Sequence, residues 1–136
     1  MEIIQITDLH ISKDKSDSNH DCLPYERLAN ILEHISTNHS QNSNLVITGD
    51  LSSDFTHESY KNISSLIKQF EFNVSILPGN HDDLNMMQLM CDDQIRLESL
   101  HCENKYFSVF NFDTHIQDNV RGVITRERSR IWRANY

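Results

Sequence analysis

The sequence predicts an α/β fold built on a largely parallel sheet. Short apolar runs of β type alternate along the chain with amphipathic helical patterns, and this alternation is typical of parallel sheets with right-handed crossovers. Polar residues follow directly after the first three apolar runs, at the strand ends where such sheets bind ligands. The length of 136 residues fits one domain.

The first two predicted strands flank a helix. EIIQIT (2–7) is short and rich in isoleucine, which predicts a strand. From Pro24 the apolar residues follow the i, i+3, i+4, i+7 spacing of one helical face, which predicts a helix over 24–38 with proline near its first turn. LVIT (45–48) predicts a second, buried strand. The apolar face of the helix comprises Leu28, Ile31, Leu32 and Ile35.

The rest of the chain continues the alternation. Apolar spacing predicts a second helix over about 57–70, and VSIL (74–77) predicts a third strand. Asp83 is placed to cap a third helix. KYFSVFNFD (105–113) predicts a fourth strand, and a last helix is expected over 124–132. The pattern assigns no element between the third helix and the fourth strand.

Composition and charge limit the classes of function. The net charge of −8 argues against a surface for nucleic acid polymers or anionic membranes. No apolar run reaches the roughly 18 residues of a membrane span, and no basic segment precedes an apolar one at the N-terminus. The three cysteines lack CxxC spacing, which favours free thiols. We therefore expect a cytoplasmic protein without membrane contact.

Side chains that bind metals follow each of the first three predicted strands. Asp8 and His10 follow the first, Gly49 and Asp50 the second, and PGNHD (78–82) the third. The mixture of imidazole, carboxylate and amide suits divalent Mn, Fe or Zn. A carboxylate can bridge two metals, and Asp50 is the candidate bridge. Each segment alone also fits an ordinary turn, but the three in order, each after a strand, favour a metal site.

These segments, DLH, GD and GNHD, resemble the motifs of the calcineurin-like metallophosphoesterases. The longer strings QITDLHIS, VITGDLSSD and LPGNHDD are similar in particular to the bacterial cyclic-nucleotide (cAMP) phosphodiesterase branch. The resemblance extends over essentially the whole chain. It implies an αββα sandwich of two sheets with helices outside, of which 1–136 would supply the N-terminal βαβαβ half of a domain incomplete at its C-terminus.

The resemblance implies a centre of two divalent ions, Fe/Mn or Mn/Mn, with Zn as an alternative. Asp8 and His10 would ligate the first ion, Asp50 would bridge both ions, and Asn80 would ligate the second through its side-chain oxygen. Two such cations can activate a hydroxide and clamp phosphoryl oxygens for in-line attack. The implied reaction is hydrolysis of a phosphodiester, with a 3',5'-cyclic nucleotide as the expected substrate.

The resemblance also implies two catalytic residues that bind no metal. His81 would lie beside the phosphate and protonate the leaving oxygen, since an imidazole exchanges protons near neutral pH. Asp82 would orient His81 by accepting the N–H of its other ring nitrogen.

Further histidine ligands of the family have no match in this sequence. The family's later motifs supply three histidines, two of them in Gly-His-x-His. After His81 only His101 and His115 remain, and neither lies in such a motif. The second metal site would keep only Asp50 and Asn80. We therefore expect the chain alone to be inactive or nearly so, and poorly soluble.

Two other interpretations of the sequence remain open. One is a non-catalytic remnant that binds at most one metal. The other is a metallophosphoesterase of different specificity: a phosphomonoesterase, a nucleotide pyrophosphatase or a nuclease. For partners we expect a small phosphodiester or nucleotide, together with a second copy of the chain or a complementing C-terminal half.

Overall fold

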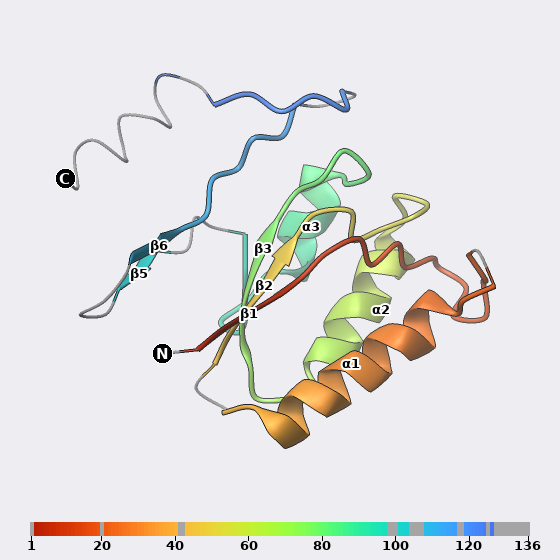
Figure 1. Cartoon of the computed structure of the whole chain (residues 1–136). Helices are drawn as coiled ribbons and strands as arrows, with labels where there is room; N and C mark the ends of the chain where they lie inside the picture. The colour runs from red at the N-terminus through yellow and green to blue at the C-terminus, as the bar shows by residue number, and fades with distance from the viewer. Residues whose placement is uncertain are drawn as a thin grey trace.

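The structure is a computed structural model that describes most of the chain. The described residues are 2–19, 21–40, 43–97, 101–103, 108–116, 119–124 and 126. Their strands form a four-stranded sheet and a two-stranded sheet, and helices connect the strands of the larger one (Figure 1).

The four-stranded sheet is parallel throughout and has the strand order β1-β2-β3-β4. Ile6 lies beside Ile47, and Ile47 lies beside Ile76. The carboxyl ends of the first three strands are therefore level, and the loops that follow them meet at one edge of the sheet. The strands are β1 (Ile3–Ile6), β2 (Asn44–Thr48), β3 (Asn73–Leu77) and β4 (Ile95–Arg96).

Three helices connect these strands, and each begins at a residue that favours a helix N-terminus. Pro24 occupies the first turn of α1, where a backbone N–H would have no acceptor within the helix, so its missing N–H costs no hydrogen bond. The side chains of Thr56 and Asp83 cap α2 and α3 by accepting backbone N–H groups of the first turn. Figure 1 shows α1 and α2 side by side along the sheet. The helices are α1 (Pro24–Asn38), α2 (His57–Ile67) and α3 (Leu84–Met90).

The hydrophobic core lies where the helices pack on the sheet. It draws on every element from β2 to β4 and on the apolar face of each helix. Burial of each large aliphatic side chain stabilises the fold by about 1.5–3 kcal/mol, so this layer fixes the strands that carry the site. Members of the core with no exposed surface include Leu32, Ile47, Ile63, Ile67, Ile76 and Met87.

Most of the elements predicted from the sequence are confirmed. The strands expected at 2–7, 45–48 and 74–77 are β1, β2 and β3, each within one residue or so of the predicted bounds. The helix expected over 24–38 has those bounds. The second helix is confirmed but ends at Ile67, and Asp83 caps the third helix as predicted.

The strand predicted over 105–113 is confirmed at Ser108–Phe110, but its expected place as the fourth strand of the parallel sheet is wrong. The parallel sheet is continued by β4 (Ile95–Arg96), in a stretch to which the sequence assigned no element. The range 105–113 instead contains β6 (Ser108–Phe110), which pairs antiparallel with β5 (His101–Glu103). A two-residue strand is too short to show an alternating pattern, and its pairing depends on contacts with β3.

The last predicted helix, over 124–132, lies almost entirely outside the described residues. Among the helices that the structure does describe, none is long and apolar enough to cross a membrane.

Candidate metal centre at the carboxyl ends of the strands

The loops after β1 and β2 are joined by backbone hydrogen bonds. Asp8 N donates to the carbonyl of Gly49 at 3.1 Å, and His10 N donates to the carbonyl of Asp50 at 3.0 Å. Ile11 N continues the pattern to Leu51 at 2.9 Å. The two loops therefore run together beyond the sheet and hold Asp8, His10 and Asp50 in fixed register.

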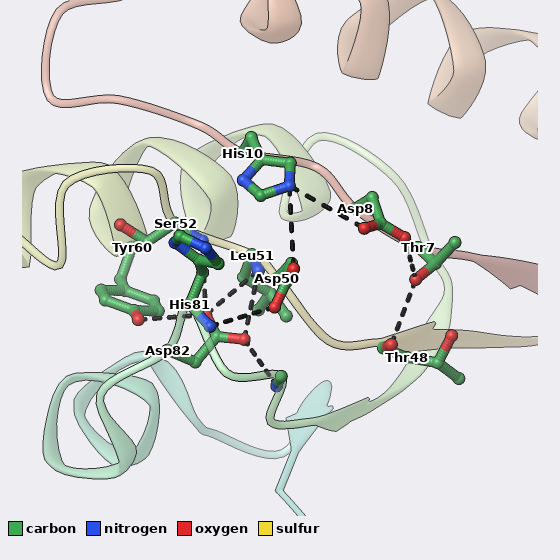
Figure 2. A network of polar contacts seen from close by, with 11 residues as sticks. Thr7, Asp8, His10, Thr48, Asp50, Leu51, Ser52, Tyr60, His81 and Asp82 are labelled. Atoms are coloured by element: carbon green, nitrogen blue, oxygen red, sulfur yellow. Dashed lines mark hydrogen bonds and ion pairs between the residues drawn. The ribbon is translucent and has the colours of Figure 1, made fainter. Parts of the chain in front are cut away.

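The loop after β3 is tied to the same group. The backbone N–H of His81 donates to Oδ1 of Asp50 at 3.1 Å. Figure 2 shows His81 beside Asp50, with Asp8 and His10 on the neighbouring loop. The loops after β1 and β3 are therefore both hydrogen-bonded to the loop that carries Asp50.

Three of the predicted metal ligands form one donor group. Each of Asp8, His10 and Asp50 offers one ligand atom, and these atoms lie within 4.8 Å of one another. Nε2 of His10 lies 3.8 Å from Oδ1 of Asp8 and 3.8 Å from Oδ2 of Asp50. These distances exceed hydrogen bonds and suit donors that share one cation at about 2.0–2.2 Å from each. Two carboxylates and an imidazole fit Mn, Fe or Zn.

Each of these three residues has a strained backbone, and among the described non-glycine residues Asp21 and Phe55 share this feature. The φ angles are 57° at Asp8, 45° at His10 and 52° at Asp50, in the left-handed region that residues other than glycine rarely adopt. Such conformations cost about 1–3 kcal/mol each and cluster at functional sites. Their coincidence with the donor group supports a role for these residues in binding.

Two glycines permit the close approach of the second and third loops. Gly49 has φ 95°, and a Cβ there would lie 2.8 Å from Cα of Gly79. A Cβ on Gly79 would overlap the carboxylate and the backbone nitrogen of Asp50. The absence of a side chain at both positions therefore lets the two loops approach closely.

The remaining ligand and acid candidates lie at the same edge. Asn80 is exposed in the turn after β3, and its role as a ligand of the second ion stays a prediction. His81 is also exposed. Its ring centroid lies 5.5 Å from that of His10 in a T-shaped contact, so the imidazole lies next to the donor group.

Asp82 has a different role from the one predicted. The residue is 1% exposed, and its carboxylate accepts hydrogen bonds from Leu51 N at 3.0 Å, Gly79 N at 2.9 Å and the Tyr60 hydroxyl at 3.1 Å. Ser52 N donates to it as well, at 3.3 Å. Burial raises the pKa of Asp82, and these hydrogen bonds oppose that rise.

The prediction that Asp82 orients the ring of His81 is therefore corrected. Among the described hydrogen bonds, those to Asp82 come from the backbone of the second and third loops and from Tyr60, and none comes from the imidazole of His81. Adjacent residues of a turn point in different directions, and here Asp82 points inward while His81 points to the site (Figure 2). Asp82 joins the loop that carries Asp50 to the loop that carries His81.

Tyr60 belongs to the site, although sequence analysis assigned no site role to it. It is 1% exposed, and its hydroxyl donates to Asp82 and accepts from Asp83 N at 2.8 Å. Burial and the neighbouring carboxylates of Asp82 and Asp83 raise its pKa. A phenol in an otherwise aliphatic stripe was the signal available, because a buried hydroxyl needs partners.

A cavity flanks Asp8. Its volume is about 380 Å³, and its wall includes Thr7, Asp8, Asn19, Cys22 and Arg27. A smaller cavity of about 180 Å³ reaches His10 from the loop before α1. The donor group therefore opens to solvent-accessible space on the side of the first loop.

Comparison with known proteins agrees with this geometry. The family model of the calcineurin-like phosphoesterases matches residues 1–132. The chain belongs to this family. Members of the family use a dinuclear metal centre, and Asp8, His10 and Asp50 form a group of side chains that could hold a metal ion.

Several bacterial phosphodiesterases are similar to this chain. A probable cyclic nucleotide phosphodiesterase of Coxiella burnetii is 28% identical over 128 residues, 92% of this chain and 50% of that protein. A probable glycerophosphodiester phosphodiesterase of Arcobacter nitrofigilis is 26% identical over 94% of this chain and 49% of its own length. The 3',5'-cyclic adenosine monophosphate phosphodiesterase of Haemophilus influenzae is 32% identical over 60% of this chain and 30% of its own. The chain thus spans half or less of these relatives.

Proposed function

We propose that this protein hydrolyses small phosphodiesters, with 3',5'-cyclic nucleotides as the favoured substrate class, at a divalent metal centre whose second ion would have only Asp50 and Asn80 as ligands in this chain, so that turnover is slow. The observation that carries the proposal is the donor group of Asp8, His10 and Asp50, formed by strained residues at the ends of adjacent parallel strands. Two of the relatives are described as cyclic nucleotide phosphodiesterases and a third as a glycerophosphodiester phosphodiesterase. A diester substrate is common to these descriptions.

Different side chains would hold the two metal ions. Asp8 and His10 would hold the first ion, Asp50 would contact both, and Asn80 would hold the second. When bound, the ions would supply Lewis acidity toward phosphoryl oxygens and lower the pKa of water. The ions would also offset the acidic net charge of the chain at the point where an anionic substrate binds.

The protein's own groups orient the donors and handle protons. The Thr7 hydroxyl donates to Oδ2 of Asp8 at 2.7 Å and fixes that carboxylate. The backbone N–H of His81 occupies Oδ1 of Asp50, which directs Oδ2 toward His10. The exposed imidazole of His81 would hold a proton at a ring nitrogen and deliver it to the leaving oxygen.

A second candidate function is the binding of a single cation without hydrolysis. One group of three His or Asp donors converges in the described part of the chain, while Asp50 and Asn80 are the two residues proposed for the second ion. A cation held by two protein oxygens and water would bind weakly.

Metal titration combined with diester assays tests both functions. Calorimetric titration of the metal-free chain with Mn²⁺ is expected to give binding that Asp50→Ala abolishes. Asp93→Ala, which removes an exposed carboxylate in the turn after α3, is the matched control and should bind as the wild type does. Bis-p-nitrophenyl phosphate, cyclic AMP and a glycerophosphodiester serve as substrates.

The stoichiometry separates the outcomes. Two ions per chain with turnover of a diester support the proposed function, and preference for cyclic AMP supports the substrate class. One ion per chain without turnover supports the second candidate. Binding that is unchanged in Asp50→Ala would contradict both.

A further inference from the structure

Phe55, in the loop between β2 and α2, combines two unfavourable features. Its ring is exposed, with 47% of the residue accessible to solvent. Its backbone has φ 59°, in the left-handed region where the Cβ of a bulky residue is crowded. A glycine would adopt this conformation without strain. An exposed aromatic ring on a strained backbone indicates that the ring itself has a function.

Hydrogen bonds hold the turn that presents Phe55. Phe55 N donates to Oγ of Ser52 at 2.9 Å, and the hydroxyls of Ser52 and Ser59 are 2.7 Å apart in the protein interior. Both serines have no exposed surface. The turn is therefore anchored to the start of α2 and to the loop that carries Asp50.

Asp54 fixes the other side of this turn. Its carboxylate accepts from Lys13 N at 2.9 Å and from Thr56 N at 3.1 Å. Burial by itself raises the pKa of Asp54, but the hydrogen bonds from Lys13 and Thr56 outweigh burial and lower it to about 2. The turn thus keeps its anchoring charge across the range in which proteins normally work.

The ring that this turn presents faces the candidate acid. The ring centroids of Phe55 and His81 lie 6.0 Å apart with an interplanar angle of 24°, an offset stack. His10 approaches the same imidazole at 5.5 Å and 74°. The carboxylate of Asp82, the acceptor expected from the sequence, is occupied by donors elsewhere. Among the described residues, Phe55 and His10 are the aromatic neighbours of the His81 ring.

We infer that Phe55 is a positioning residue that fixes the plane of the His81 imidazole by stacking on it. The inference deepens the proposed function, on which it rests, because orientation of His81 matters where that ring delivers a proton to the leaving oxygen. The stacked ring limits rotation of the imidazole in the way that a hydrogen-bonded carboxylate would.

The first test measures ring contact in the metal-free chain and needs no activity. The imidazole Hδ2 and Hε1 resonances of His81 are assigned by NMR in the wild type and in Phe55→Tyr and Phe55→Leu. We expect ring-current shifts in the wild type that Phe55→Tyr retains and Phe55→Leu removes. His81 resonances that are the same in all three proteins would overturn the inference.

The second test separates positioning from stability. Phe55→Gly relieves the backbone strain, so its midpoint of thermal unfolding is expected to match or exceed that of the wild type. Its kcat for bis-p-nitrophenyl phosphate should nevertheless fall at least about tenfold, part of the 10²–10⁴ that a positioned general acid contributes. Phe55→Tyr should restore kcat. Leu89→Ala, which removes an exposed apolar side chain on α3, is the control and should leave kcat unchanged.

Two further outcomes would count against the inference. An unchanged kcat in Phe55→Gly would overturn it. A rise in KM for cyclic AMP alone, with kcat intact, would overturn it in favour of a platform that stacks the substrate's base. If the wild type hydrolyses no diester, the proposed function fails, while the NMR comparison still decides whether Phe55 orients His81.

Discussion

The interior side and the solvent side of this site use the same residue types in opposite ways. On the interior side, Asp82 is 1% exposed and accepts from backbone N–H groups of two loops and from Tyr60. On the solvent side, the side chain of Asp50 is 17% exposed and accepts one backbone N–H, with Oδ2 lying 3.8 Å from His10. The number of protein donors that each carboxylate meets decides whether it holds loops together or stays open to a ligand.

Tyr60 and Phe55, two aromatic residues beside the site, follow the same division. Tyr60 is buried in the core, where its hydroxyl links Asp82 to the start of α3. Phe55 is exposed on a strained backbone and stacks on His81. The interior residue holds the loops together, and the solvent-facing residue is the one that we infer orients the imidazole of His81.

The largest expected effect comes from removing the buried carboxylate. Asp82→Ala would leave backbone donors of Leu51, Ser52 and Gly79 and the Tyr60 hydroxyl without their acceptor. Each buried donor left unpaired costs about 1–3 kcal/mol, so we expect the free energy of unfolding to fall by more than about 3 kcal/mol. Urea denaturation measures the loss. A loss below about 1 kcal/mol would show that Asp82 does not join the loops.

A substitution where the two sides meet should affect metal binding as well as stability. In Gly79→Ala the new methyl group would overlap the carboxylate of Asp50. We expect a loss of about 1–3 kcal/mol in stability from overpacking, together with Mn²⁺ affinity that is at least about tenfold weaker because Asp50 must move. Calorimetric titration beside urea denaturation measures both quantities. Wild-type Mn²⁺ affinity in a folded variant would show that Asp50 does not depend on this close approach.

Removal of the phenol oxygen should have a smaller effect that is confined to stability. Tyr60→Phe retains the packing of the ring but removes its bonds to Asp82 and to Asp83 N. We expect a loss of about 1–2 kcal/mol, the contribution of hydrogen bonds that include a charged group. Mn²⁺ affinity should stay within about twofold of the wild type, since Leu51 N, Ser52 N and Gly79 N still hold Asp82. A larger change in metal affinity than in stability would contradict the division between the two sides.

The smallest expected effect is the pH dependence of the stability that Asp54 contributes in the turn that carries Phe55. The pKa of Asp54 is lowered in the folded protein from 3.8 to about 2, so the folded state favours its charged form. The stability that Asp54 contributes is therefore present above about pH 4 and is lost as the pH falls toward 2.

Asp54→Asn tests this sign. The wild type should be more stable than the variant at pH 7 by less than about 1 kcal/mol after solvent screening, and the difference should shrink as the pH approaches 3. Thermal unfolding across this pH range measures it. A difference that grows on acidification would mean that Asp54 is not held as a charged group.

The helices and strands that carry the site could be predicted from the sequence. Apolar periodicity is a local property, and it correctly placed β1 to β3 and α1 to α3. The polar segments after three successive strands were visible for the same reason. Level strand ends in a parallel sheet then bring Asp8, His10 and Asp50 together without further information.

The tertiary structure alone decided what lies around these residues. Tyr60 and Asp82 are 22 positions apart, and Leu51 and Asp82 are 31 apart. Contacts over such separations depend on how the helices pack on the sheet, so no local pattern encodes them. The interior role of Asp82, the two-residue strand β4 and the stack of Phe55 on His81 are consequences of packing. A residue's type and place in the chain predict which side chains could bind a metal. Only packing determines which of their carboxylates are occupied by hydrogen bonds inside the protein and which remain open to a ligand.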